Sequence, residues 1–184
     1  MAVLLSAAPS VTADSWSYPA KVSDKVFTFG DTKIVLTVDG TKDQKSPDFL
    51  FRVYENEQLR AQIHNVWFEQ VFASPDRRLF LGLSNSGIPG TAAVLFDRHG
   101  SVSLLVNHGI AKFDYCEESV TVQRRWYDEA NPRVDFHSDK KAKGTSGITL
   151  ADCRGQIIDL GDVVLKAYNT TFQGTLRDKA AQRP

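Results

Sequence analysis

Histidines, cysteines and paired carboxylates are the side chains of this chain that could do chemistry, and their spacing argues against a catalytic or metal centre. There is no His-x-x-x-His or Cys-x-x-Cys pair among His64, His99, His108, His137, Cys116 and Cys153. Glu117-Glu118 and Asp128-Glu129 are adjacent carboxylates, but neighbours on an extended chain point apart. No Gly-x-Ser-x-Gly elbow or phosphate-binding loop occurs. We therefore expect no enzyme, metal or cofactor, structural roles for His64 and His108, and an exposed turn at His99.

Composition narrows the class of partner. The 184 residues include 22 Lys+Arg and 22 Asp+Glu, so the formal net charge is zero, and 42% of the residues are hydrophobic. A nucleic-acid-binding domain normally carries a basic excess, which this chain lacks. No apolar run reaches the roughly 18 residues of a membrane span. These numbers predict a globular domain that binds neither nucleic acid nor the membrane interior.

Short β-rich segments recur along the chain in pairs, and a tight turn joins the two segments of each pair. The histidines, cysteines and paired carboxylates lie in or beside these segments. Three first hairpins, VFTFGDTKIVLTV, VFASPDRRLFLGL and FDYCEESVTVQR, are each followed by a second hairpin. In the later two units the second hairpins carry matching turns, Asp97-Arg98-His99-Gly100 and Asp152-Cys153-Arg154-Gly155. The pattern predicts an all-β fold of three tandem four-stranded antiparallel meanders, stacked like propeller blades or flattened into a β-sandwich.

The domain boundaries follow from these units. One all-β domain is expected over residues 26–167, with repeats at 26–65, 69–108 and 112–160. An N-terminal arm or signal remnant would occupy residues 1–25, and a tail residues 168–184. The start of the chain has an apolar run and a small-residue segment but no positive n-region, so it is an incomplete signal peptide.

Alternating strand direction predicts where the loops lie. All tight turns should share one end of the domain, and the long loops 39–48, 84–91 and 127–146 should gather at the other. Loops on a rigid scaffold are common binding sites, although these could also be mere length variation. Trp67 lies in a connector, and Trp126-Tyr127 opens the longest loop, so these aromatic residues are either partner anchors or core. The charges of the third loop, which include Asp128 and Arg133, would form the rim.

Cys116 and Cys153 both fall in the third unit, near the same end of the expected meander. Strands one and three of a flat sheet lie about 9–10 Å apart, which exceeds the roughly 4.4–6.8 Å between the Cα atoms of a disulfide. A bridge therefore requires twist or bending of the turn. The alternatives are a disulfide in an oxidising compartment and two buried thiols; we favour the disulfide, and with it export.

The run VFASPDRRLFLGLSNSGIPGTAAVLFDRHGSVSLLV, residues 71–106, resembles small periplasmic all-β immunity proteins that protect bacteria from type VI secretion effectors, which cleave peptidoglycan as amidases. The matching pieces are Arg77-Arg78, the serine-containing loop and Phe96-Asp97. In that family the loop enters the active-site cleft of the effector. The resemblance implies this role for Ser84, Asn85 and Ser86, with Gly87 and Ile88 beside them.

These observations give one main hypothesis and one alternative. The main hypothesis is a periplasmic immunity or inhibitor protein, whose partner is a secreted cell-wall-degrading effector. The alternative is a propeller-like binding module for an envelope protein or a cell-wall glycan. Neither requires chemistry from this chain.

Overall fold

The structure is a computed structural model that describes residues 17–109, 113–118, 123–137 and 147–163. Its first layer is a four-stranded antiparallel sheet in which each strand pairs with the next along the chain. The strands are β1 (Val22–Phe29), β2 (Thr32–Asp39), β3 (Asp48–Glu55) and β4 (Gln58–His64). Leu36 lies opposite Phe51, and Phe51 opposite Ile63, so apolar side chains of three strands share one face. The first predicted meander is present.

The second layer is also a four-stranded antiparallel meander, as predicted. Its strands are β5 (Gln70–Ala73), β6 (Leu79–Leu83), β7 (Thr91–Asp97) and β8 (Val102–Asn107). Almost every residue of β6 and β7 is buried, whichever way its side chain points. Continuous apolar runs of this kind are typical of strands covered on both faces.

The third unit does not form a four-stranded sheet, contrary to the prediction. A two-stranded ribbon and a separate three-stranded sheet replace it, with β9 (Glu117–Glu118), β10 (Arg124–Arg125), β11 (Asp135–Phe136), β12 (Ile148–Ala151) and β13 (Ile157–Asp159). Glu117 and Glu118 are strand residues that lie opposite Arg125 and Arg124. Among the described residues, no strand of the ribbon is hydrogen-bonded to a strand of the three-stranded sheet.

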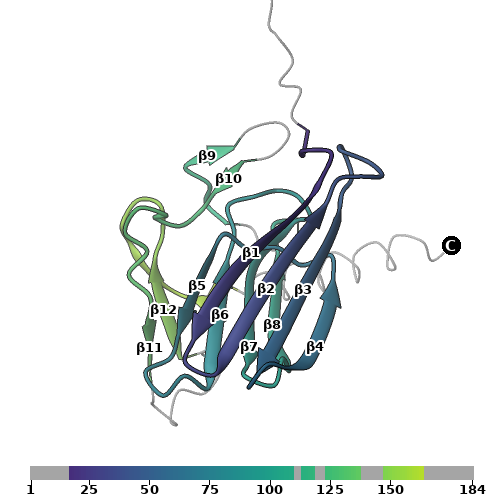
Figure 1. Ribbon diagram of the computed structural model, residues 1–184. Coiled ribbons are helices and arrows are strands. Elements are labelled where there is room, and N and C mark those ends of the chain that lie inside the picture. Colours follow the sequence, from purple (N-terminus) through teal and green to yellow (C-terminus); the bar gives the residue numbers. More distant parts are fainter. Residues whose placement is uncertain (1–16, 110–112, 119–122, 138–146, 164–184) are drawn as a thin grey trace, which may run out of the picture.

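The second sheet lies between the other two layers. Figure 1 shows the first sheet in front of it and the third unit to one side. One hydrophobic core joins the first and second sheets and includes Ile34, Leu36, Phe51, Val53, Phe80 and Phe96. Another joins the second sheet to the third unit and includes Leu81, Leu83, Leu95, Trp126, Ile148 and Leu150. The described residues are therefore an all-β stack of layers.

Two glycines allow the layers to approach closely. A Cβ on Gly82 would lie 2.6 Å from the ring of Phe68, in the core between the first two sheets. A Cβ on Gly100 would lie 2.1 Å from the Cβ of Ala61, and Gly100 has a φ of +79°. The turn after β7 can therefore rest directly on β4 only because glycine stands at this position.

The two matching turns have the same hydrogen bonds but lie at opposite ends. Oδ1 of Asp97 accepts from the N–H groups of His99 and Ser101, and Asp152 repeats this arrangement two and four residues later. The first turn lies with Arg78, whose carbonyl accepts from the N–H of Arg98. The second lies with Trp126, whose carbonyl accepts from Cys153. The prediction that all tight turns share one end is wrong for the third unit, because the chain crosses the molecule before β12 begins.

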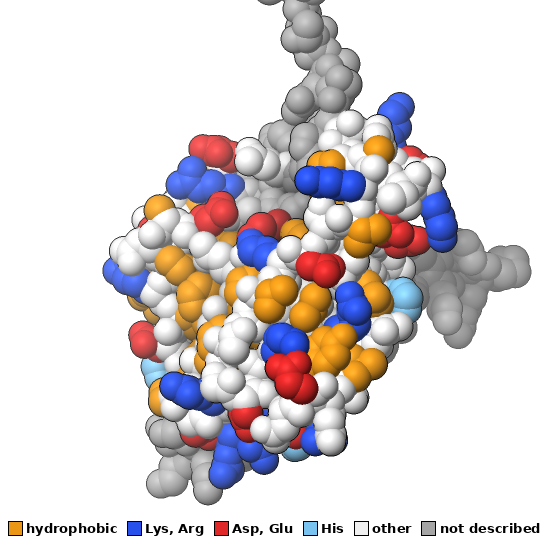
Figure 2. Space-filling view, viewed as in Figure 1, with side chains coloured by type: hydrophobic (Ala, Val, Ile, Leu, Met, Phe, Trp, Pro, Cys, Tyr) orange, Lys and Arg blue, Asp and Glu red, His pale blue; other side chains and the backbone are white. Residues whose placement is uncertain are grey.

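The outward face of the first sheet is mixed in character. Val26 and Leu59 are exposed on it. Figure 2 shows hydrophobic side chains scattered among charged ones over this face. A polar ladder crosses three strands, because Thr37 donates to Asp24 and Arg52 donates to Thr37. Within the described residues, no helix has the length and apolar character needed to span a bilayer.

Candidate partner-binding pole

Two of the three long loops meet at one end of the molecule, and Tyr18 joins them. The Tyr18 N–H donates to the carbonyl of Gln44 in loop 39–48 (2.9 Å), and its ring packs edge-on against Phe49 (5.4 Å). Its hydroxyl is hydrogen-bonded to Ser86 in loop 84–91, and burial raises the pKa of Tyr18 to about 12. These loops and residues 127–131, which begin the third long loop, are called the loop pole.

The third long loop does not stay at the loop pole. Asn85 reaches its beginning, because Nδ2 donates to Oε2 of Glu129 (3.4 Å). The chain then runs along the molecule, and Phe136 and His137 line a groove with Ser74, on the turn between β5 and β6. The predicted gathering of all three loops is therefore correct only for the beginning of the third. Residues 138–146 lie outside the described part.

Ser84 and Asn85 hold the loop pole to the core and are not surface groups. Their exposed fractions are 1% and 8%. Oδ1 of Asn85 accepts from the N–H of Trp126 (3.1 Å), and the carbonyl of Ser84 accepts from the indole N–H of Trp126 (2.8 Å). The interpretation of these two side chains as direct partner contacts is wrong for this structure, because both are buried. Oδ1 of Asn85 satisfies a buried backbone N–H, and the Ser84 hydroxyl accepts from the N–H of Ser86 (3.0 Å).

Glu69 is the residue of this network that the sequence analysis missed. Its carboxylate accepts from the N–H of Asn85 (3.1 Å) and from the indole of Trp67 (3.2 Å). Its backbone carbonyl accepts from Nζ of Lys25 (2.6 Å). Burial raises the pKa of Glu69, and hydrogen bonds from Ser84 and Asn85 oppose the shift. A charged residue inside the apolar run VWFEQVF was the available sequence signal, because such a group requires buried donors.

The tip of loop 84–91 is half-buried and internally bonded. The Ser86 hydroxyl donates to the carbonyl of Ile88 (2.8 Å), and the Ile88–Pro89 peptide is cis. The carbonyl of Gly90 accepts from the N–H of His108 (2.8 Å). These hydrogen bonds hold the tip in one shape. Ser86, Gly87 and Ile88 remain partly accessible, so a partner could contact that shape.

Loop 39–48 is the projecting part of the loop pole. Residues 41–46 are all exposed, and Figure 1 shows the β2–β3 connection extending beyond the sheets. Oδ1 of Asp39 accepts from the N–H (2.9 Å) and the hydroxyl (2.5 Å) of Thr41, and these bonds lower the pKa of Asp39. Oδ1 of Asp43 accepts from the N–H of Lys45 (2.8 Å). Local hydrogen bonds therefore shape an otherwise exposed loop.

The remaining predicted site residues have separate fates. Trp126 and Tyr127 are 1% and 0% exposed, and Trp126 stacks on Phe113 (4.2 Å between centroids). They are core residues, so the interpretation as surface anchors is wrong for both. Trp67 is half-buried, and Asp128 is partly accessible. Arg133 is exposed but donates to the carbonyl of Gly155 (3.3 Å), beyond the loop pole.

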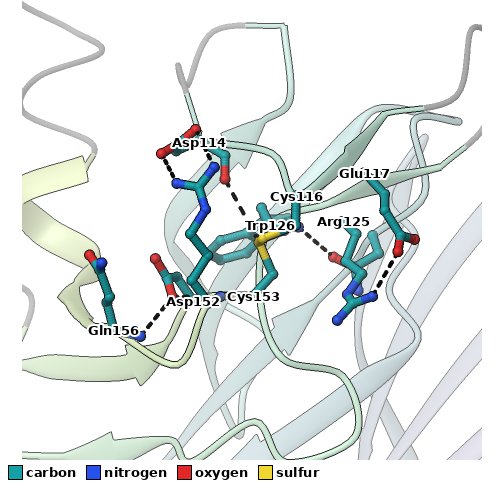
Figure 3. Close-up of a disulfide and its surroundings, with 10 residues drawn as sticks. Asp114, Cys116, Glu117, Arg125, Trp126, Asp152, Cys153 and Gln156 are labelled. Carbon is teal, nitrogen blue, oxygen red and sulfur yellow. Dashed lines mark hydrogen bonds and ion pairs between the residues drawn. A yellow bond between two sulfur atoms is a disulfide. The ribbon is translucent and has the colours of Figure 1, made fainter.

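A disulfide joins Cys116 to Cys153, which confirms the predicted bridge. Their Cα atoms lie 6.1 Å apart, within the usual range. Figure 3 shows the bond linking the start of the ribbon to the turn between β12 and β13. Arg154 of that turn pairs with Asp114 beside the bridge. The short ribbon strands are thus fixed covalently to the three-stranded sheet.

Of the two histidines expected to have structural roles, His108 is buried, whereas His64 is exposed at the end of β4, so that expectation is wrong for His64. Nε2 of His108 donates to the carbonyl of Ser84 (3.2 Å), and Nδ1 lies 3.3 Å from the hydroxyl of Tyr115. Burial, helped by the charge of Arg124, lowers the pKa of His108 to about 4. His99 is exposed in its turn, 3.5 Å from the carboxylate of Glu55. The predicted structural role of His108 and exposed turn at His99 are confirmed.

The lowered pKa of His108 predicts a loss of stability on mild acidification. Between the unperturbed pKa of 6.5 and about 4, the unfolded chain binds a proton that the folded protein does not, so the free energy of unfolding falls as the pH falls. We expect His108→Gln to lose this component, measured by urea unfolding at pH 7 and pH 5. The exposed His64→Gln is the control. An identical pH dependence in His108→Gln and the unmodified protein would contradict the assignment.

The loop pole contains no arrangement of groups that suggests a reaction. Within the described ranges, no group of three or more His, Cys, Asp or Glu residues could hold a metal ion. Among its buried polar groups, Glu69 and Asn85 bond to one another and to the backbone, whereas the hydroxyl of Tyr127 has no hydrogen-bond partner among the described residues. The arrangement can present a preformed surface. No protein-family model, curated protein or solved structure matches this chain.

Proposed function

We propose that this chain is a non-catalytic immunity or inhibitor protein that binds a secreted cell-wall hydrolase at the loop pole and covers its active-site cleft. One observation carries the proposal: Tyr18 ties the projecting loop 39–48 to the bonded tip of loop 84–91. Two loops from different sheets thereby present one surface on a stacked scaffold. Loops that are already ordered lose little entropy on docking, which favours tight binding.

The geometry changes which residues would enter the partner's cleft. Ser84 and Asn85 are held in the interior, so their side chains would act by shaping the loop. The accessible contacts are Gly87 and Ile88 at the tip and the exposed residues 41–46. A cleft covered by these two loops would exclude substrate without any chemistry from the inhibitor.

A protein partner suits the loop pole better than a glycan. Sugar recognition commonly uses exposed aromatic rings, and two of the three candidate rings, Trp126 and Tyr127, are buried. The accessible groups instead carry charges of both signs, with Lys42, Asp43 and Lys45 on one loop. Mixed charge is typical of an interface rim that steers a protein partner.

The disulfide supports the exported location that the proposal requires. Disulfides persist in oxidising compartments such as the periplasm and are rare in the cytosol. The Cys116–Cys153 bond fixes the third unit, on which the loop pole rests through Trp126 and Asn85. A periplasmic location would place the protein where cell-wall hydrolases act.

The proposal is tested with a charge-matched pair of variants. Lys42→Glu/Lys45→Glu alters the loop pole, and Arg77→Glu/Arg78→Glu makes the same change of charge in the exposed turn at the opposite end. The immobilised protein is used to isolate its partner from the source organism, and release of peptides from peptidoglycan is measured with and without each variant. We expect the loop-pole variant to bind about tenfold more weakly or worse, which corresponds to about 1.4 kcal/mol or more.

The control variant should inhibit like the unmodified protein. Capture of an enzyme that releases peptidoglycan peptides, together with loss of inhibition in the loop-pole variant alone, supports the proposal. Equal inhibition by both variants, or a captured partner without activity on peptidoglycan, contradicts it. Capture of purified peptidoglycan itself would favour the glycan-binding module.

A further inference from the structure

The first strand, β1, is an outer edge of the first sheet, and among the described residues no strand pairs with its free side. The two four-stranded sheets end in the edge strands β1, β4, β5 and β8. The β1–β2 ladder runs over the eight residues Val22–Phe29 without a register shift. The ladders that contain β4 and β8 have register shifts, and β5 has four residues. Within the described ranges, β1 is therefore the longest regular edge.

The hairpin of β1 with β2 determines which backbone groups face the free side. Phe29 lies opposite Thr32 across a two-residue turn, and the residues that close such a turn exchange backbone hydrogen bonds. Since the hydrogen-bonding direction alternates along a strand, the N–H and C=O groups of every second residue point away from β2. These residues are Val22, Asp24, Val26 and Thr28. In the part of the chain that the structure describes, none of them has a backbone hydrogen bond on that side.

This edge lacks the features that commonly prevent the addition of a strand. Proteins protect sheet edges with proline, bulges or free charged side chains. The sequence of β1 contains no proline, and its ladder contains no bulge. Thr37 donates to the carboxylate of Asp24 (2.5 Å), and Nζ of Lys25 donates to the carbonyl of Glu69 (2.6 Å). Both charged side chains of β1 are therefore held by other groups of this chain.

A shallow hollow of about 230 Å³ lies beside β1, on the side that faces the second sheet. Its lining is mostly apolar and consists of Phe27, Glu69, Gln70, Val71, Phe72 and Pro132. Phe27 also packs against the core between the first two sheets, so it marks the inner side of the edge. A strand added to β1 would place every second side chain on this inner side, at the hollow.

The surroundings of the edge favour one extended segment over a second copy of the whole chain. Figure 1 shows β5, β11 and β12 on the side of β1 that faces away from β2. Pro132, from the connection between β10 and β11, reaches the hollow beside Phe27. A single added strand would lie over β5, whereas symmetric pairing of two copies would bring their third units against each other. Val22 and Val26 are 55% and 54% exposed, so apolar side chains suit the outer face too.

We propose that β1 binds an extended, apolar segment of the partner protein as an additional strand of the first sheet. Main-chain hydrogen bonds to the outward groups of β1 would hold the segment, and an inward apolar side chain would occupy the hollow. The partner as the source of the segment rests on the proposed function, because the edge is continuous with the loop pole. Val22 lies opposite Asp39, where loop 39–48 begins.

The free protein tests whether the edge is open. Amide exchange followed by NMR should be fast at Asp24, Val26 and Thr28, whose N–H groups point outward, and slow at Lys25 and Phe27, whose N–H groups face β2. Slow exchange of the outward amides at every protein concentration would identify a segment of this chain at the edge. Slow exchange that is lost on dilution would identify a second copy. Either result overturns the proposal.

A peptide probe tests strand binding without the partner. The probe is N-acetyl-Lys-Val-Thr-Val-Thr-Val-Lys amide, and its control carries proline in place of both threonines and therefore lacks two N–H donors. We expect the probe to shift the NMR signals of the amides of Asp24, Val26 and Thr28, and the control peptide to shift none of them. No response to the probe at millimolar concentration would overturn the edge as a strand-binding site.

Variants of β1 test the contribution of the edge to binding of the isolated partner. Val26→Pro removes an outward N–H and leaves the β1–β2 ladder intact, whereas the matched control Val26→Thr keeps the N–H. Binding should weaken about tenfold in Val26→Pro and stay close to that of the unmodified protein in Val26→Thr. Val26→Lys/Thr28→Lys places two charges on the edge and should weaken binding likewise, which keeps the test valid if the proline variant does not fold.

Exchange in the complex separates this inference from the proposed function. The isolated partner should slow exchange at Asp24, Val26 and Thr28. If these amides and the binding of Val26→Pro were unchanged while Lys42→Glu/Lys45→Glu lost inhibition, strand pairing would be overturned and the proposed function would stand. If the three amides were protected while the loop-pole variant inhibited normally, strand pairing would stand and the loop pole would be contradicted. A partner without activity on peptidoglycan would contradict the proposed function, and the same three amides would still decide the pairing.

Discussion

Replacing Trp126 by alanine is expected to lower the free energy of unfolding by about 3–5 kcal/mol. The side chain is fully buried, stacks on Phe113 and lies edge-on to Tyr127 at 5.3 Å. Its removal leaves a large cavity between the second sheet and the third unit. It also removes the indole donor to the carbonyl of Ser84, which the loop pole uses as an attachment.

Urea unfolding of Trp126→Ala and Trp126→Phe measures these two contributions. Phenylalanine keeps much of the ring contact but cannot donate to Ser84, so we expect a smaller loss of about 1–2 kcal/mol. Trp126→Phe also remains informative if the alanine variant does not fold. If the free energy of unfolding of Trp126→Ala equalled that of the unmodified protein within error, Trp126 would be a surface residue and the third layer would be assigned incorrectly.

Removing the disulfide is the second change with a large expected effect. The Cys116–Cys153 bond closes a loop with a sequence separation of 37, which corresponds to about 3–4 kcal/mol from restricting the unfolded chain. The effect should be large because the bond attaches the ribbon to the turn between β12 and β13, and among the described residues no strand pairing joins the ribbon to the three-stranded sheet. We expect Cys116→Ala/Cys153→Ala to unfold at a lower urea concentration.

The matched control for the disulfide is chemical reduction of the unmodified protein. A reductant should lower its unfolding midpoint to about that of Cys116→Ala/Cys153→Ala, and should leave the double variant unchanged. Mass spectrometry after alkylation of the unfolded protein counts the free thiols in each sample. Two alkylated thiols before reduction, or a midpoint insensitive to reductant, would show that the bridge is absent or contributes nothing.

The first two layers could be predicted because local signals and packing agree there. Alternating apolar residues, tight turns and the continuous apolar runs of β6 and β7 all indicate consecutive antiparallel strands. The matching turns at Asp97 and Asp152 share their hydrogen bonds because the aspartate and glycine positions determine the turn locally. A segment can be predicted from its sequence when its local structural preference agrees with its tertiary packing.

The third unit could not be predicted because its local pattern does not determine direction. The segment containing Glu118 and Arg124 looks like the first hairpin of a four-stranded meander, yet its described residues form a ribbon apart from the three-stranded sheet. Where the chain crosses to the opposite end depends on the burial of Trp126 and Tyr127 against the second sheet. That is a tertiary preference, which alternation within one strand does not encode.

The loop pole was predicted in position but not in detail. The role of Ser84 and Asn85 as partner contacts was implied by the resemblance to immunity proteins, in which the loop enters the cleft of the effector. Their burial depends on partners distant in sequence, Glu69 and Trp126, which supply the complementary groups. Only the structure reveals that loop 84–91 is held to the interior by hydrogen bonds, and that its tip and the neighbouring loop 39–48 are the accessible parts.

The most direct test of the account is the footprint of the isolated partner on this protein, measured by amide hydrogen exchange in the free and bound states. We predict slower exchange in peptides that span residues 39–48 and 84–91, and unchanged exchange in the turns at residues 74–78 and 98–100. Protection confined to those two turns, with the loop pole exchanging as in the free protein, would contradict the central claim.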